Sequence, residues 1–361
     1  MRKIPVALVG ATGMTGQQFV ALLHDHPFFE LQVLTASSRS AGKSYREVAK
    51  WYIDRPMPER IAQMKVVNTT VDGIFRHGEV KVIFCGLPSG VAREIEPELA
   101  KHGMTVFSDA GCFRMEADMP VLIPEANPDH LDLLPFQRTL RGWTGGIVKN
   151  PNCTLVGTVM TLKPLLRYGV KQVYLSSMQA LSGAGYDGVP SMAIIDNVIP
   201  YIADEEGKVE AESLKILGRL DTAAGTVVPH GMGISASCHR VGTLYGHLSA
   251  VFVEFEGEVD LDEIKEAIRG FRSEPQTLEL PTAPREPLRL FEDPFRPQPR
   301  LDRDLGEPER CKGMAVAVGR VRYDSTGKHR IKLINLSHNT IRGAAGNSVL
   351  SAELAVRRGF V

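Results

Sequence analysis

The feature that most constrains the fold of this chain is a glycine-rich turn directly after the first apolar run. Residues Ile4 to Val9 form a short stretch of β character, and Gly10-Ala-Thr-Gly13-Met-Thr-Gly16 follows at once. Thr15 to His24 then carries apolar residues at helical spacing, and Leu31 to Ala36 is a second candidate strand. A strand, a tight turn, a helix and a strand within about 30 residues indicate a parallel βαβ unit with a right-handed crossover.

The glycine turn also predicts binding of a dinucleotide. Glycines between a strand and a helix let the backbone approach a pyrophosphate at the helix N-terminus, where free N–H groups and the helix dipole favour anions. Glycine patterns also occur in ordinary βα turns that bind nothing, so that alternative stays open. The predicted cofactor contacts in this turn are Gly10, Thr12, Gly13, Met14, Thr15 and Gly16.

The end of the second strand indicates which dinucleotide is bound. A NAD site usually has an acidic residue here for the ribose 2′-hydroxyl, whereas NADP needs basic or hydroxyl groups for its phosphate. No Asp or Glu occurs between positions 33 and 45. The segment therefore favours NADP, although Arg39 and Lys43 could also be solvated loop charges. The predicted contacts are Ser37, Ser38, Arg39, Ser40 and Lys43.

The length and the order of elements predict two domains of α/β class. A chain of 361 residues is long enough for two hydrophobic cores. Strand and helix patterns alternate over residues 1–150, which we interpret as a Rossmann-like dinucleotide-binding domain. Further elements there are strands Val80 to Cys85 and Met104 to Ser108, and a helix from Ser89 to Lys101.

Residues 151–339 have the pattern of an α+β domain with a mixed or antiparallel sheet, preceded by turn residues from Gly145 to Cys153. A Pro-rich, charged segment at 276–312 is expected to form an extended surface excursion. The expected strands are Gln172 to Met178, His247 to Phe255, Met314 to Tyr323 and His329 to Leu336. The expected helices are Thr154 to Leu166, Val259 to Gly270 and Gly343 to Val361.

Composition excludes several classes of protein. The 42 basic and 42 acidic residues cancel, which argues against a nucleic-acid binder that relies on a basic face. No apolar run approaches the length of about 20 residues needed to span a bilayer, so no membrane partner is expected. The five cysteines are scattered without CxxC pairing, which fits neither a disulfide framework nor a zinc site. We therefore expect a cytoplasmic protein without a metal.

Cys153 differs from the other cysteines in its position. It lies in Asn150-Pro-Asn-Cys-Thr154, where a turn meets a predicted helix. Thiols at helix N-termini have lowered pKa values and form thiolates near neutral pH, which makes Cys153 a candidate nucleophile. The alternative is a small buried hydrophobic residue, because free cysteines commonly fill cores.

Seven motifs extend this reading over nearly the whole chain. In these motifs the sequence resembles the aspartate-β-semialdehyde dehydrogenase family, particularly its archaeal and fungal members. They occur in the family's order: GATGMTG, SDAGCFRMEADMPVLIPEANP, NPNCT, QALSGAGYDG, EAESLKILG, SCHRVGTLYGH and HNTIRGAAGN.

The resemblance implies a role for each matching residue. Cys153 is the expected catalytic thiol, His247 the general acid/base and Gln179 the residue that orients the reacting group. Arg240 is expected to clamp the substrate carboxylate, a task for which a guanidinium fork is well suited. The other expected substrate contacts are Glu212, which helps to hold the substrate, and Lys215, Arg114 and Asn152, which face its phosphate. Ser182, Gly183 and Asn347 are expected at the cofactor, with Asn347 toward the nicotinamide carboxamide.

The resemblance further implies NADP-dependent reduction of β-aspartyl phosphate to aspartate semialdehyde through a Cys153 thioester. That reaction belongs to the biosynthesis of lysine, threonine and methionine. It also implies a homodimer or homotetramer built through the second domain's sheet, and a C-terminal segment, 340–361, that returns to the first domain. Without the resemblance, His247 would be read as a core histidine, Arg114 and Arg240 as surface residues, and Asn347 as a helix cap.

Other functions on the same scaffold stay open. Malonyl-CoA reductases are similar and retain the thiol and the histidine. Two departures keep that alternative: His239 stands where many archaeal-type dehydrogenases have Asn, and Leu248-Ser249 replaces a common Thr-Glu pair. Asn152 favours the aspartate enzyme. N-acetyl-γ-glutamyl-phosphate reductase fits the second-domain motifs less well, and a non-catalytic NADP sensor would be expected to lose the thiol or the base.

Overall fold

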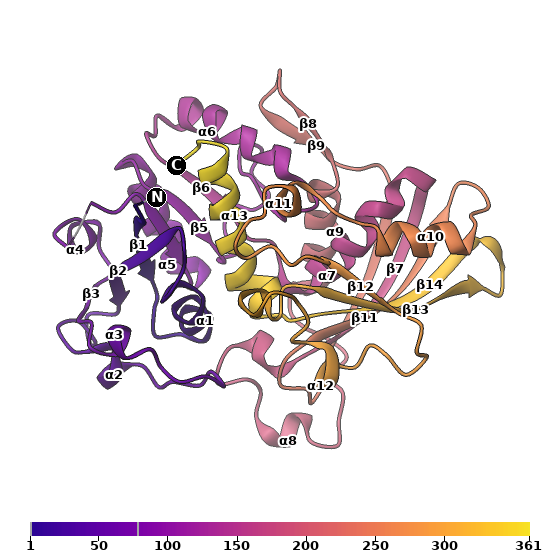
Figure 1. Ribbon diagram of the computed structural model, residues 1–361, viewed down its shortest axis with the longest axis horizontal. Coiled ribbons are helices and arrows are strands. Elements are labelled where there is room, and N and C mark those ends of the chain that lie inside the picture. Colours follow the sequence, from indigo (N-terminus) through magenta and orange to yellow (C-terminus); the bar gives the residue numbers. More distant parts are fainter. Residues whose placement is uncertain (1, 78) are drawn as a thin grey trace.

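Two six-stranded sheets organise the chain, one on each side of the molecule (Figure 1). The computed structural model describes residues 2–77 and 79–361. The first sheet is parallel throughout, in the order β3-β2-β1-β4-β5-β6. Its strands are β1 (Ile4–Val9), β2 (Phe29–Ala36), β3 (Val66–Asn68), β4 (Val82–Cys85), β5 (Thr105–Ser108) and β6 (Gly146–Lys149).

The first sheet is buried on both faces, as parallel sheets usually are. In β1, Val6 and Leu8 face the core that α1 and α13 share, while Ala7 and Val9 face the core formed with α5. The last helix therefore packs against the first sheet although it ends the chain (Figure 1). The helices of this part are α1 (Met14–Leu23), α2 (Tyr45–Val48), α3 (Glu59–Ala62), α4 (Val71–Phe75), α5 (Ser89–Lys101), α6 (Leu133–Arg141) and α13 (Gly346–Arg357).

The second sheet is mixed and is covered by helices on one face only. Its order is β10-β7-β11-β14-β13-β12, with β7, β11, β14 and β13 successively antiparallel and β10 and β12 parallel to their neighbours. Its strands are β7 (Val170–Gln179), β10 (Gly233–Arg240), β11 (His247–Phe255), β12 (Leu288–Phe291), β13 (Val316–Asp324) and β14 (Gly327–Ser337). The helices α7 (Cys153–Leu162), α9 (Glu205–Ile216) and α10 (Leu261–Arg269) contribute to its core.

Smaller elements complete the second part of the chain. A hairpin of β8 (Arg219–Asp221) and β9 (Thr226–Val228) projects at the top of Figure 1. The remaining short helices are α8 (Ser191–Ile194), α11 (Glu274–Thr277) and α12 (Pro299–Asp302). The predicted α/β class with a second, mixed sheet is confirmed.

The expectation of a surface excursion at 276–312 is wrong for much of 280–288 and for Cys311, whereas residues 289–310 lie mainly at the surface. Leu280 and Cys311 are buried in the core of the first sheet, and Leu288 lies in the core of the second. Four residues of the segment form β12, which pairs with β13 at the sheet edge. Between these contacts the segment returns to the surface, where Phe295 and Leu301 are exposed.

A buried ion pair connects the first sheet to the segment that leads to the second. Lys149, the last residue of β6, donates a hydrogen bond of 2.8 Å to Glu96 of α5 and another of 2.8 Å to the Ser108 hydroxyl. Ser108 in turn donates to the other oxygen of Glu96. Both charged side chains have 0% exposure. Removing one partner would leave an uncompensated charge in the interior, which is strongly destabilising.

We therefore expect Lys149→Met to lower the free energy of unfolding by about 3–5 kcal/mol, measured by urea denaturation. The matched control is Lys101→Met, because Lys101 forms an ion pair with Glu98 in which both side chains are about half exposed. That exposed pair is screened by solvent, so its urea midpoint should not move. Equal losses in the two variants would contradict a structural role for the buried pair.

Candidate active site

Cys153 begins α7 and faces a histidine from the second sheet. Asn152 is the N-cap of the helix, and its side chain accepts a hydrogen bond of 2.8 Å from the Thr154 N–H. The Cys153 Sγ lies 3.3 Å from Nε2 of His247, the first residue of β11. The structure thus brings together two residues that are 94 positions apart, at the junction of the two sheets.

The hydrogen bonds of His247 define which nitrogen carries its proton. The main-chain N–H of Ala180 donates to His247 Nδ1 at 3.0 Å. Because Nδ1 accepts, the neutral ring carries its proton on Nε2 and directs it toward the sulfur. His247 is therefore placed as a hydrogen-bond donor that stabilises negative charge on the sulfur, or on an oxygen bonded to the carbon that the sulfur attacks.

Both groups are neutral in the free protein. Burial, followed by the charge of Glu205, raises the pKa of Cys153 to about 12, although Arg114 and Arg240 act in the opposite direction. Burial, followed by Arg240 and His338, lowers the pKa of His247 to about 3. The expectation that Cys153 is a thiolate near neutral pH is therefore wrong for the free protein, because desolvation and a nearby carboxylate outweigh the helix terminus.

Gln179 and Arg240 lie opposite each other on β7 and β10. The Gln179 amide donates a 3.3 Å hydrogen bond to the Ser177 hydroxyl, and Arg240 Nη1 donates a 2.7 Å hydrogen bond to the Ala180 carbonyl. Gly183 packs against Arg240 and His247, since a Cβ there would lie 2.6 Å from Arg240 Nη1 and 3.1 Å from His247 Cε1. The absence of a side chain at Gly183 keeps both groups in place.

The residues expected at the phosphate are tied together by Glu212 of α9. Its Oε1 lies 3.1 Å from Arg114 Nη1, and its Oε2 accepts the Asn152 N–H at 2.7 Å. Lys215, one turn further along the helix, donates to the carbonyls of Arg114, Glu116 and Met119 at 2.7–2.8 Å. These three bonds use every proton of its ammonium group, so the structure shows Lys215 holding the Arg114 loop rather than facing a phosphate.

The C-terminal segment packs against the cysteine. A Cβ at Gly343 would lie 2.7 Å from the Cys153 Cβ. The Asn150 amide donates to the Gly343 carbonyl at 2.8 Å, and the Asn347 amide donates to the Asn150 Oδ1 at 2.7 Å. Asn347 has 0% exposure, so the structure does not present its side chain to a nicotinamide. Its visible role is to hold the turn that carries Cys153.

The glycine turn fits a pyrophosphate. Gly10 has a φ of 80°, and a Cβ at Gly16 would lie 2.3 Å from the Gly10 carbonyl oxygen, so side chains are excluded at both positions. Gly13 is the N-cap of α1 and provides no side-chain cap, which leaves the first N–H groups of the helix available to an anion. Thr12, Met14 and Thr15 are partly exposed around this turn.

The loop after β2 lies beside the glycine turn. The Ala11 N–H donates to the Thr35 carbonyl at 3.0 Å, which joins the ends of β1 and β2. Ser37, Ser38, Arg39 and Lys43 are exposed there, and Ser40 is partly exposed. Hydroxyl and cationic groups that face solvent next to the pyrophosphate position suit the extra phosphate of NADP.

A cleft with a volume of about 770 Å³ separates the two parts of the chain near this turn. Met14 lines it from α1 and Ser182 from the segment after β7. The Ser182 hydroxyl accepts a 2.8 Å hydrogen bond from Asn339. Tyr52 and Tyr186 stack across the cleft with ring centroids 3.2 Å apart.

Two further features are absent from the described part of the chain. None of the helices at 2–77 and 79–361 is long and apolar enough to cross a membrane. Within the same residues, no group of three or more His, Cys, Asp or Glu side chains is arranged to hold a metal ion.

Comparisons with known proteins show the family of this chain. Residues 5–134 match the family model "Semialdehyde dehydrogenase, NAD binding domain", and residues 162–342 match "Semialdehyde dehydrogenase, dimerisation domain". The chain belongs to the semialdehyde dehydrogenase family.

Several relatives match this chain over nearly its whole length. The aspartate-semialdehyde dehydrogenase of Methanothermobacter thermautotrophicus is 50% identical, over 97% of this chain and 98% of that protein. The malonyl CoA reductase (NADP) of Metallosphaera sedula is 36% identical over 100% and 99% of the two chains. The crystal structure of the Candida albicans aspartate semialdehyde dehydrogenase with NADP superposes with a TM-score of 0.88, at 35% identity, over all of both chains.

The sequence does not reveal two residues of this dehydrogenase that hold other site residues in place. Asn150 was read only as part of the cysteine motif, yet it links Gly343 to Asn347. Glu205 was not singled out, yet its Oε1 accepts a 2.9 Å hydrogen bond from Thr154, next to the thiol. The only signal for Glu205 in the sequence was its place two helical turns before Glu212, which puts both on one face of a helix.

The dehydrogenase's thiol should show its raised pKa in chemical modification. With a pKa of about 12, the thiolate fraction of Cys153 is small at pH 7 and grows about tenfold per pH unit. We expect the rate of Cys153 alkylation by iodoacetamide, followed by peptide mass spectrometry, to rise steadily between pH 7 and 10. A plateau near pH 7 would instead indicate a resting thiolate. The Cys153→Ser variant reports the background from the four buried cysteines.

Proposed function

We propose that this chain is an NADP-dependent aspartate-semialdehyde dehydrogenase, which converts β-aspartyl phosphate to aspartate semialdehyde and phosphate in a reversible reaction. The observation that carries the proposal is the Cys153 thiol at 3.3 Å from the His247 imidazole, with Arg240 and Arg114 near enough to affect its pKa. The 50% identical relative over nearly the whole chain supports the same activity.

Cys153 acts as the nucleophile. Its sulfur forms a bond to the β-acyl carbon while the bond between that carbon and the phosphate oxygen breaks, and the thiol proton leaves on the departing phosphate. The phosphate leaves toward Arg114 and Asn152, and an acyl thioester remains on the enzyme. Arg114 suits this task because its guanidinium is held by Glu212 while carrying a permanent positive charge.

His247 and Gln179 surround the reacting carbon. The Nε2–H of His247 stabilises charge that develops on the acyl oxygen and on the departing sulfur. Bound NADPH supplies the hydride that reduces the thioester to the aldehyde. The Gln179 amide adds a neutral dipole to the site and orients the acyl group without changing the net charge.

The cofactor is NADP, held between the glycine turn and the loop after β2. The pyrophosphate position is supported by Gly10 and Gly16, which have no room for side chains, and by the uncapped N-terminus of α1. Arg39 and Lys43 provide positive charge for the additional phosphate. The relative of known structure was crystallised with NADP, which supports this choice.

Malonyl-CoA is the alternative acyl donor, supported by the 36% identical reductase. Two of the three residues that suggested it carry less weight in the structure. His239 lies between Cys238 and Arg240 on β10, so its side chain points to the opposite face of the sheet from Arg240. Leu248 alternates with the buried His247 in the same way on β11, whereas Ser249 is buried on the same face as His247. His239 and Leu248 therefore do not face the acyl group.

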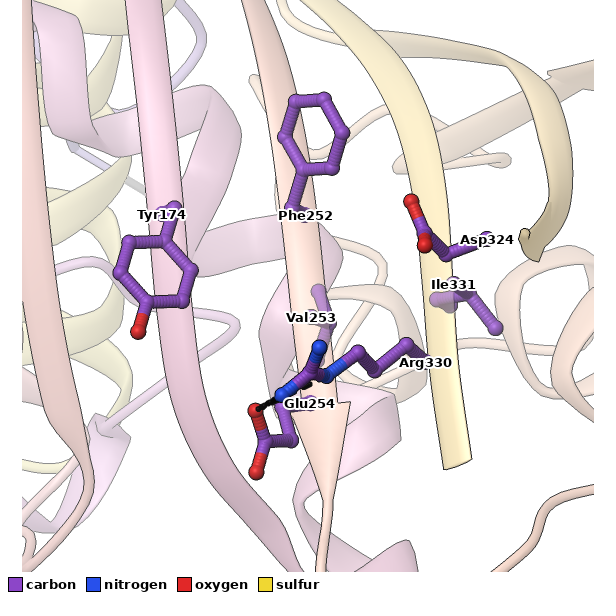
Figure 2. Close-up of a pocket in the computed structure, with 7 residues that line it drawn as sticks. All are labelled: Tyr174, Phe252, Val253, Glu254, Asp324, Arg330 and Ile331. Carbon is purple, nitrogen blue, oxygen red and sulfur yellow. Dashed lines mark hydrogen bonds and ion pairs between the residues drawn. The ribbon is translucent and has the colours of Figure 1, made fainter. Parts of the chain in front are cut away.

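The enzyme forms a homodimer through the open face of the second sheet. Figure 2 shows Tyr174 and Phe252 standing on neighbouring strands of that face, with Arg330 reaching to Glu254 across it. Tyr174 is 52% exposed and Phe252 43%, and together they line a hollow of about 390 Å³. Large aromatic side chains exposed on a sheet mark an interaction surface, and the matched family model carries the name of a dimerisation domain.

The five cysteines are all free thiols, and four of them are buried. Free thiols persist in reducing compartments, which supports the expected cytoplasmic setting. Cys153 is the one cysteine that is partly exposed, as a nucleophile must be.

The activity is tested by phosphate-dependent reduction of NADP with aspartate semialdehyde, followed at 340 nm. We expect activity that depends on phosphate, is weaker with NAD and is lost in Cys153→Ala. Malonyl-CoA with NADPH is run beside it. Turnover of malonyl-CoA alone would preserve the thiol and the cofactor but overturn the substrate assignment.

The dimer is tested by Phe252→Arg, which places a charge at the centre of the open sheet face. We expect the variant to elute as a monomer in size-exclusion chromatography with light scattering, while the wild-type protein is a dimer or tetramer. Leu140→Arg is the matched control, because Leu140 is 74% exposed on α6, away from this sheet. An unchanged mass for Phe252→Arg would move the interface elsewhere.

A further inference from the structure

A strip of polar side chains interrupts the apolar inner face of the second sheet, next to the residues of the active site. Ser177 of β7 lies opposite Ser249 of β11, and Ser249 lies opposite Asn335 of β14. Ser177 is 0% exposed, and the other two are each 1% exposed. The inner positions of the following row are apolar and belong to the core: Leu175, Val251 and Leu333. Buried polar groups cost free energy unless they are hydrogen-bonded, so the strip requires partners or a function.

The hydrogen bonds of the strip differ from one residue to the next. The Asn335 amide donates a 3.2 Å hydrogen bond to the Thr158 hydroxyl of α7. The Ser177 hydroxyl accepts a 3.3 Å hydrogen bond from the amide of Gln179, which lies two residues further along β7 on the same face. The Ser249 hydroxyl has no hydrogen-bond partner within residues 2–77 and 79–361. Ser177 therefore connects the buried strip to the active site.

We propose that Ser177 is a positioning residue for the reaction: its hydroxyl holds the NH2 end of the Gln179 amide inside the sheet, so that the Gln179 carbonyl oxygen faces the reacting carbon. This inference deepens the proposed function and rests on it. An amide carries a donor group and an acceptor group on one carbon, and a side chain that rotates freely presents either of them. Holding the NH2 group therefore makes Gln179 an acceptor toward the substrate.

Cys238 supports the same orientation of the amide. It is the register partner of Ser177 on β10 and is 0% exposed. Burial raises the pKa of Cys238 to about 11, whereas hydrogen bonds from Ser177 and Gln179 act in the opposite direction. Groups that lower the pKa of a thiol in this way direct their hydrogens toward the sulfur. The hydroxyl hydrogen of Ser177 thus faces Cys238, and its oxygen is left to accept the NH2 group of Gln179.

An acceptor at Gln179 complements the donor at His247. Nε2 of His247 carries the proton, because Nδ1 accepts the Ala180 N–H. When the Cys153 thiol adds to the aldehyde, its sulfur bonds to the carbonyl carbon and its proton moves to the oxygen, which becomes a hydroxyl group. That oxygen accepts a hydrogen bond from His247, and its hydrogen is donated to Gln179. The two side chains together define the position of one hydroxyl, which an NH2 group turned toward it would not do.

A double-mutant cycle on Ser177 and Gln179 tests the assignment. Ser177→Ala removes the acceptor and leaves the amide free to turn. We expect its kcat for aspartate semialdehyde to fall on the order of 10-fold, the equivalent of one hydrogen bond, while KM stays close to the wild-type value. In a Gln179→Ala background, Ser177→Ala should have no further effect, because its role depends on that side chain. Ser177→Thr retains the hydroxyl and should restore most of the rate.

Ser249→Ala is the matched control. Ser249 lies opposite Ser177 in the same strip and is similarly buried, but its hydroxyl has no partner in the described part of the chain. Its removal should leave kcat unchanged. Urea denaturation of every variant separates altered folding from altered catalysis. If Ser177→Ala does not fold, Ser177→Cys takes its place, because a thiol has a similar volume but is only a weak acceptor.

Three outcomes would overturn the role of Ser177. A wild-type kcat in Ser177→Ala would remove it, and losses that add up in the double variant would show that Ser177 acts independently of Gln179. An equal loss in Ser249→Ala would indicate a general effect of packing beneath the site. In each of these cases the dehydrogenase activity stands. A wild-type protein that is inactive with aspartate semialdehyde and phosphate would instead overturn the proposed function, and the role of Ser177 with it.

Discussion

The site depends on the short linker Lys149–Thr154, which joins the two sheets and is held by hydrogen bonds along its length. Glu96 fixes its first residue in the core of the first sheet, and Gly343 of the C-terminal segment accepts from its second. Glu212 binds the N–H of Asn152, and Glu205 binds the hydroxyl at the end of the linker. Because these partners come from both halves of the chain, the thiol is placed only when both have folded and packed together.

Hydrogen bonds around this linker allow charged side chains to be buried beside Cys153. Each carboxylate near the cysteine has a hydrogen-bond donor from the protein, and the Glu212–Arg114 pair is almost completely desolvated but mutually compensated. The reacting pair itself stays neutral at rest, with the Cys153 thiol facing the Nε2–H of His247.

The sequence predicts those elements and site residues whose pattern lies within a short stretch of the chain. The first βαβ unit and Cys153 at a helix start follow from short-range patterns, and Ile4–Val9 and Ser89–Lys101 have the predicted bounds. β6 lies where the sequence predicts a turn, because its four residues, among glycines and prolines, show no periodicity. The burial of Leu280 and Cys311 and the raised pKa of Cys153 depend on residues distant in sequence, with Glu205 acting on the thiol. The sequence also does not show whether the ammonium protons of Lys215 face a phosphate or, as in the structure, three main-chain carbonyls.

The alternation of side chains in the second sheet separates the candidate active site from the proposed dimer face. On β7, Gln179 points to the helix-covered face that carries the site, and Tyr174 points to the open face. On β11, His247 points to the helix-covered face and Phe252 to the open face. Because neighbouring positions on a strand face opposite directions, a substitution such as His239 can alter the partner surface without touching the substrate. Differences from the family at open-face positions therefore bear on the proposed dimer, and substrate specificity has to be inferred from the inward positions beside the thiol.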